Sequence, residues 1–266
     1  MFHEISGLGR DEKLRAQLRW RVLGVILTVA FFLTGCAANK ALRQKEGRSS
    51  RDLGERYLAR NQPSKALEHF LKALELLPDD PYLHYDLALT YDYKGALDKA
   101  EYHVREAIKL KSDYSNAYNY LGTIYYRQGR MEEAIQAFEK ALSNLLYMAP
   151  QDAQRNLGRV YLDLKQYHEA IIHLKEAIRL VPDFVPALND LGKAYEGLKM
   201  YGEARRAYEK ALEYNPEYAG ALLNMGKFLY RSGEKQKSKA YFEKVIRTEP
   251  GSDSANEARS YLGAMR

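Results

Sequence analysis

The chain has 266 residues, of which 46% are aliphatic or aromatic and 29% are charged. This balance supports a continuous core and excludes extended disorder. The formal net charge of +6 is modest and basic residues alternate with acidic ones, which disfavours nucleic acid as a partner. The single cysteine, Cys36, excludes an internal disulfide.

The first predicted element is an export signal over residues 1–35. Arg15, Arg19 and Arg21 precede an apolar run at residues 22–33. A helix needs about 20 apolar residues to span a bilayer, so this run is too short to cross it comfortably. A basic segment before such a run is typical of a secretory signal. The segment upstream is long for such a signal, which leaves the true start of translation open.

The signal ends in Leu33-Thr34-Gly35-Cys36, which resembles the lipobox of bacterial lipoproteins. The resemblance implies diacylation of the Cys36 thiol, cleavage before Cys36 and further N-acylation. Two or more acyl chains anchor a protein firmly, whereas one does so marginally. An uncleaved signal anchor with an incidental cysteine is the alternative.

The residues that follow Cys36 indicate where the protein is sorted and how it is attached. In enteric bacteria an Asp after the lipidated cysteine retains lipoproteins at the inner membrane. Ala37 stands here instead, so the resemblance implies the periplasmic face of the outer membrane. Residues 36–46 are short and polar, and we predict that they form a lipidated tether.

A pattern that recurs about every 34 residues fills the rest of the chain. A bulky residue followed by a small one returns at spacings of 34, 34, 36, 34 and 34: Leu53-Gly54, Leu87-Ala88, Leu121-Gly122, Leu157-Gly158, Leu191-Gly192 and Met225-Gly226. An aromatic residue or leucine follows three positions later, at Tyr57, Tyr91, Tyr125, Tyr161, Tyr195 and Leu229. The next turn carries a proline at Pro78, Pro182, Pro216 and Pro250. Proline lacks the amide hydrogen that a continuing helix needs, so it helps to end each unit.

This pattern resembles the tetratricopeptide repeat. The resemblance implies an all-α fold, a right-handed superhelical solenoid of six helix-turn-helix repeats over residues 47–252. The repeats are residues 47–80, 81–114, 115–150, 151–184, 185–218 and 219–252. Small residues such as Gly54 and Ala66 let the two helices of a hairpin approach, and bulky Tyr57 and Phe70 fill the gap to the next hairpin. Residues 253–266 are expected to form a capping helix.

In this family the binding groove lies on the first helix of each repeat, at repeat positions 2, 5, 9, 12 and 13. The predicted groove residues here are Leu58, Tyr82, Tyr85, Leu89, Tyr93, Asn116, Asn119, Tyr126, Arg127, Arg155, Arg159, Asn189, Lys193, Lys227, Tyr230 and Arg231. The early half is aromatic and apolar, and the later half is basic and rich in amides. Aromatic residues and Arg dominate interface energetics, so we expect a protein partner here. Any single one of these residues could equally be an ordinary surface residue.

Family members that clamp a peptide C-terminus place Lys, Asn, Asn, Lys and Arg at fixed groove positions. Those positions hold Arg51, Glu55, Asp86, Asn116 and Tyr120 here, so a carboxylate clamp is not supported. The basic residues of the later half could still attract an acidic segment.

Patterns typical of catalysis or metal binding are missing from the sequence. His69, His103 and His173 share one repeat position, which we interpret as a helix-surface position. His168 and His173 are five residues apart and do not share a helix face well. We therefore expect no enzymatic activity, no metal and no cofactor beyond the covalent lipid on Cys36.

A lipoprotein with six such repeats resembles the type IV pilus biogenesis lipoproteins that act as pilotins. The two-residue insertion within residues 141–150 is similar to an irregularity in that family. The resemblance implies a monomer that touches the membrane through its lipid only and assists a pilus secretin to localise and multimerise. The alternative is an envelope adaptor for peptidoglycan enzymes or polysaccharide export, which gene neighbourhood would distinguish.

Overall fold

The computed structural model describes residues 10–265, without the side chains at residues 10–14, 16–17 and 24–38. Over the described range it contains helices and turns and no strand. The chain divides into two compact units, residues 1–96 and residues 97–266, and each is described by itself.

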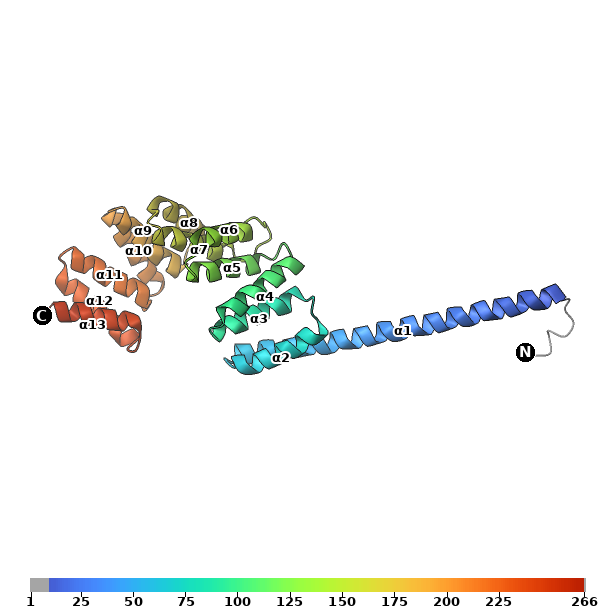
Figure 1. Ribbon diagram of the computed structural model, residues 1–266. Helices are drawn as coiled ribbons and strands as arrows, with labels where there is room; N and C mark the ends of the chain where they lie inside the picture. Colours follow the sequence, from blue (N-terminus) through green and yellow to red (C-terminus); the bar gives the residue numbers. More distant parts are fainter. Residues whose placement is uncertain (1–9, 266) are drawn as a thin grey trace. The chain divides into compact units, whose positions relative to one another are not determined.

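The first unit contains helices α1 (Arg10–Ala59), α2 (Pro63–Leu76) and α3 (Pro81–Tyr93) (Figure 1). Helix α1 runs without interruption through residues 36–46, which the sequence suggested as a tether. The side chain of Cys36 lies outside the described residues, so its lipidation stays a prediction. Among the described residues, no helix combines the length and the apolarity that crossing a membrane requires.

A glycine and an aromatic ring join α1 and α2 into the first hairpin. A Cβ atom placed on Gly54 would lie 2.5 Å from the ring of Phe70, so the missing side chain is what lets this ring rest on α1. Phe70 also packs with Leu83 and Leu87 of α3. The sequence interpretation placed Phe70 only in the gap to the next hairpin, and the structure shows that it fills both spaces.

The second unit contains ten helices, each of which packs on the next. They are α4 (Leu97–Leu110), α5 (Ser115–Arg127), α6 (Met131–Leu142), α7 (Pro150–Asp163), α8 (Tyr167–Leu180), α9 (Val185–Gly197), α10 (Tyr201–Tyr214), α11 (Ala219–Arg231), α12 (Lys235–Thr248) and α13 (Asp253–Ala264). The predicted fold class, helical hairpins in series followed by a terminal helix, is confirmed. The pairing of Gly54 with Phe70 returns in this unit as Gly122 with Phe138, Gly158 with Leu174, Gly192 with Tyr208 and Gly226 with Phe242.

The same backbone turn follows the first helix of every repeat. The residue at repeat position 15 has a positive φ of 58° to 81° in all six repeats: Asn61, Gly95, Gly129, Lys165, Lys199 and Gly233. The amide of the next residue donates to the carbonyl oxygen five residues earlier, at 2.8–2.9 Å. This bond is the helix-ending arrangement for which glycine is favoured. The turn therefore keeps its shape even where lysine occupies the strained position.

Candidate partner-binding surface

The predicted groove residues all lie on the first helices of the hairpins, namely α1, α3, α5, α7, α9 and α11. Six are exposed: Tyr82, Tyr93, Asn116, Arg127, Lys193 and Arg231. Nine are half-buried: Leu58, Tyr85, Leu89, Asn119, Tyr126, Arg155, Arg159, Lys227 and Tyr230. Asn189 is buried, which removes its side chain from any partner's reach.

Aromatic side chains of α3 are accessible in the first unit. Tyr82 and Tyr93 are exposed by 39% and 59%. The Tyr93 hydroxyl donates to the Asn61 side chain, which orients its ring. Burial, together with the charge of Asp86, raises the pKa of Tyr85 to about 12, so this phenol stays neutral at physiological pH. Leu58, by contrast, packs against the core of the unit.

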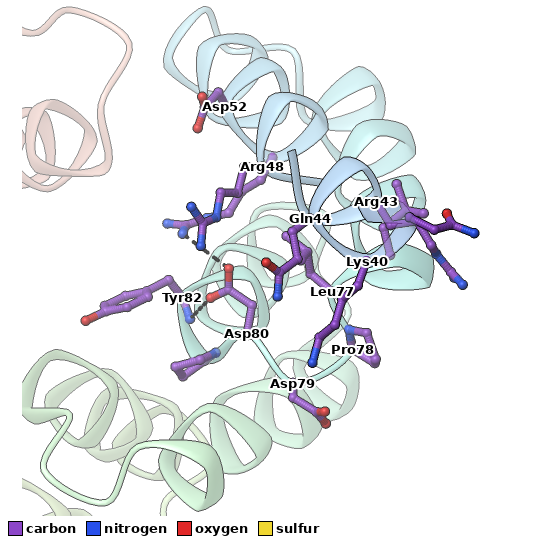
Figure 2. Close-up of a pocket in the computed structure, with 14 residues that line it drawn as sticks. Lys40, Arg43, Gln44, Arg48, Asp52, Leu77, Pro78, Asp79, Asp80 and Tyr82 are labelled. Atoms are coloured by element: carbon purple, nitrogen blue, oxygen red, sulfur yellow. Dashed lines mark hydrogen bonds and ion pairs between the residues drawn. The ribbon is translucent and has the colours of Figure 1, made fainter. Parts of the chain in front are cut away.

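A pocket of 940 Å³ opens beside Tyr82, between α1 and the turn that leads into α3 (Figure 2). Its α1 wall includes Lys40, Arg43, Gln44 and Arg48, none of which was predicted as a site residue. Lys40, Arg43 and Gln44 were missed because residues 36–46 were interpreted as a tether. Arg48 lies at repeat position 2 of the first repeat but was not included among the predicted groove residues. The spacing of all four is nevertheless that of one helix face, so this signal was present in the sequence.

Arg51 is the centre of an ion-pair network in the first unit. Its guanidinium lies 2.7 Å from Asp86, 2.8 Å from Glu55 and 3.7 Å from Asp80, and 5.4 Å from the centre of the Tyr82 ring. Burial raises the pKa of Asp86 to about 6, although the Arg51 charge acts to lower it. Arg51 is thus paired with carboxylates, and acidic Glu55 and Asp86 occupy positions where a carboxylate clamp would need free cations.

A row of hydrogen bonds links the first helices of the second unit. Repeat position 5 of one hairpin bonds to position 6 of the next. The pairs are Asn119 with Asn156 at 3.1 Å, Arg155 with Asp190 at 2.9 Å and Asn189 with Asn224 at 2.9 Å. Three predicted groove residues therefore hold neighbouring repeats in register, which limits what they can offer a partner.

A second row joins repeat position 12 to position 13 of the next hairpin. The Tyr126 hydroxyl donates to Asp163, and Arg231 donates to Glu196. Glu196 also accepts a bond of 2.7 Å from the hydroxyl of Tyr208.

The remaining basic residues of the predicted groove also have internal partners. Arg159 lies 5.0 Å above the ring of Tyr126, and Lys193 lies 3.7 Å from Asp190. Lys227 lies 2.7 Å from Glu257 of the terminal helix α13. The later half is thus a surface of balanced charges, more neutral than its sequence indicated.

The prediction that His69, His103 and His173 occupy helix surfaces is wrong for His103, which is buried. His69 and His173 are half-buried. His69 stacks on Tyr57 and His173 on Tyr161, with ring centres 5.2 and 5.3 Å apart. Burial lowers the pKa of His173, which favours the neutral form of the stacked imidazole. Among the described residues, no group of His, Cys, Asp and Glu is placed to hold a metal ion.

Models of the tetratricopeptide repeat match the chain at residues 54–95, 113–183, 185–218 and 220–252, which together make up more than half of its length. The chain belongs to the tetratricopeptide repeat proteins. Its repeats, its paired helices and its ladder of inter-repeat contacts define a scaffold for protein–protein interaction.

Within this class the chain is related in sequence to the type IV pilus assembly protein PilF of Pseudomonas aeruginosa. The two are 30% identical over 164 residues, which is 59% of this chain and 65% of PilF. The human protein O-mannosyl-transferase TMTC3 is 33% identical over 138 residues, which is 51% of this chain and 15% of that enzyme. In both alignments the chain spans less than two thirds of the relative's own length.

Two solved structures share the fold. The structure of Pseudomonas aeruginosa PilF superposes with a TM-score of 0.70 at 24% identity, covering 82% of this chain and 99% of that one. The structure of PilW, a type IV pilus biogenesis factor, gives 0.73 at 24% identity, covering 79% of this chain and 97% of that one. At this identity the superpositions establish the arrangement of helices and nothing further.

Proposed function

We propose that this protein is a lipid-anchored, non-enzymatic scaffold of the outer membrane that assists a type IV pilus secretin to localise and form its ring. The single observation that carries the proposal is the sequence relationship to PilF, a type IV pilus assembly protein, over 164 residues. The repeats supply the means, because stacked hairpins present long surfaces to protein partners.

The anchor in this proposal is a lipid on Cys36, supported by the lipobox-like residues 33–36. Labelling of cells with radioactive palmitate tests it. The full chain takes up label and sediments with outer membranes, and the Cys36→Ser variant does neither. Label on the Cys36→Ser variant would show that the lipid is attached elsewhere.

The secretin contact in this proposal is the cluster of Tyr82, Tyr85 and Tyr93 on α3. Two of these rings are exposed, and α3 is already ordered, so little entropy is lost when a partner covers them. Tyrosine offers an apolar body and a polar hydroxyl, which suits a partly hydrated interface. The Arg51 guanidinium beside Tyr82 holds that ring in place.

The test is to replace Tyr82, Tyr85 and Tyr93 by Ala in the full chain and to measure secretin multimers in the outer membrane. We expect multimers to fall at least tenfold at normal levels of the variant protein. The matched control replaces the exposed Tyr102, Tyr201 and Tyr214, which lie on the second helices α4 and α10. Equal multimer levels in the two variants would reject this contact.

The alternative function is an envelope adaptor for peptidoglycan enzymes or polysaccharide export. Pilus genes beside this gene favour the secretin, whereas cell-wall genes favour the adaptor. A pull-down from membranes with the lipidated protein identifies the partner directly.

A further inference from the structure

The loop at residues 143–149, between α6 and α7, carries the two-residue insertion of the third repeat. Three of its large apolar side chains are almost fully exposed: Leu145 by 98%, Leu146 by 84% and Met148 by 91%. Ile172 on α8, for comparison, is exposed by 66%. Three such residues within four positions form an apolar tip of the kind that marks an interaction site.

Asn144 braces the loop with three hydrogen bonds. The Asn144 side-chain amide donates to the carbonyl oxygen of Asp113 in the neighbouring turn, at 3.0 Å. Its side-chain oxygen accepts from the amide of Leu146 at 2.9 Å, and its main-chain oxygen accepts from the amide of Tyr147 at 3.1 Å. The apolar tip is therefore presented by a hydrogen-bonded turn, which reduces the conformational entropy that would be lost on binding.

The surroundings of the tip indicate what covers it. Turns between hairpins share one edge of the second unit, because successive helices run antiparallel. The turns of this edge, together with the four helix residues on either side of each turn, carry five cationic side chains and eight carboxylates. The cations are Lys109, Lys111, Lys140, Arg179 and Arg247, and the carboxylates are Asp113, Glu139, Asp152, Asp183, Glu213, Glu217, Glu249 and Asp253. No charged residue occurs from Leu142 to Gln151. An anionic bilayer surface would be repelled by this edge, whereas a protein pocket with a basic rim would be attracted.

We propose that Leu145, Leu146 and Met148 form a second docking element, which inserts into an apolar pocket rimmed by Lys or Arg on the partner protein. This contact adds to that of α3 and lies in the other structural unit. The identification of the partner as the secretin rests on the proposed function. The chemistry of the partner's pocket is inferred from the loop alone.

Photo-crosslinking in living cells tests the contact. The photoreactive residue p-benzoyl-phenylalanine replaces Leu145 in the full chain, and a matched control places it at Ile172. We expect a protein adduct from position 145 whose mapped peptide contains apolar and basic residues, with at least tenfold less from position 172. An adduct with lipid, with a second copy of this chain, or with nothing overturns the proposal, as does an equal yield at both positions.

The identity of the adduct separates this inference from the proposed function. An adduct with the secretin supports both. An adduct with another protein supports the docking element and removes the secretin as its partner. The purified adduct protein is then titrated with the wild type and with the L145S/L146S/M148S variant. We expect at least a tenfold loss of affinity at an unchanged melting temperature, since these side chains are outside the core. An unchanged affinity overturns the inference.

Discussion

Arg155 and Asp190 connect two successive repeats through a bond of 2.9 Å from Nε to the carboxylate, and Arg51 and Asp86 make the same connection at 2.7 Å in the first unit. Both pairs use repeat positions 5 and 6. Asp190 and Asp86 have side chains that are 5% and 14% exposed, so each arginine is the nearest cation to a largely buried carboxylate. Residues at groove positions thus stabilise the stack before any partner binds.

Replacement of Arg155 by Ala should lower the free energy of unfolding by about 2–3 kcal/mol. The reason is that the buried Asp190 carboxylate loses its guanidinium partner, which costs more than the loss of an exposed pair. Urea unfolding followed by circular dichroism measures the change. The control is Arg206→Ala, which breaks an exposed pair with Glu203 within α10 and should have little effect. Equal losses in the two variants would contradict a specific role for the inter-repeat pair.

The pKa of Asp86, raised to about 6 by burial, predicts a pH dependence of stability. The folded state holds this proton more tightly than the unfolded chain, where the pKa is 3.8. Stability from this group is therefore greatest at low pH and is lost as pH rises from 4 to 7. Asp86→Asn cannot titrate, so the stability of the wild type relative to this variant should fall by about 2–3 kcal/mol over that range.

Urea unfolding of both proteins at each pH provides this comparison. The titration of the carboxylates that both proteins share cancels in the difference between their free energies of unfolding. A further check is Arg51→Gln, which should move the Asp86 midpoint above 6, since the Arg51 charge acts to lower the pKa of Asp86. A difference between wild type and Asp86→Asn that stays constant from pH 4 to 7 would show that this carboxylate is not perturbed.

The sequence predicted the helical hairpins well, because their determinants are local or repeat at one period. Gly54, for example, faces Phe70 sixteen positions later, and this relation recurs in other repeats. The surface was harder to predict, because it depends on pairs between repeats. Asn189 is a polar residue at a groove position, yet it is buried and its side-chain oxygen accepts a hydrogen bond from the side-chain amide of Asn224. The polar composition of residues 36–46 indicated a tether, although helical spacing of Lys40, Gln44 and Arg48 was equally visible.

The contact of Gly226 with Phe242 predicts a non-additive pair of substitutions. A Cβ atom at Gly226 would lie 2.7 Å from the Phe242 ring, so Gly226→Ala should destabilise the protein by about 1–3 kcal/mol. Phe242→Val also destabilises, since it leaves a cavity. The double variant should lose at least about 1 kcal/mol less than the sum, because valine leaves room for the methyl group. Thermal unfolding of the three variants measures this coupling. Strictly additive losses would show that a methyl group at position 226 does not clash with the Phe242 ring.

The residue at repeat position 15, which has a positive φ, predicts stability changes of opposite sign for two substitutions. Lys165 and Lys199 have φ values of 59° and 60°, where a side chain costs about 1–2 kcal/mol. Replacing either with Gly removes this strain but adds chain entropy to the unfolded state, which costs about 0.5–1 kcal/mol. We expect a net gain of about 0.5–1 kcal/mol for Lys165→Gly, and a loss of about 1 kcal/mol for Gly129→Ala at its φ of 76°. Melting temperatures of the two variants should move to opposite sides of the wild type. A lower melting temperature for Lys165→Gly would mean that the lysine side chain stabilises the turn by more than its backbone strain costs.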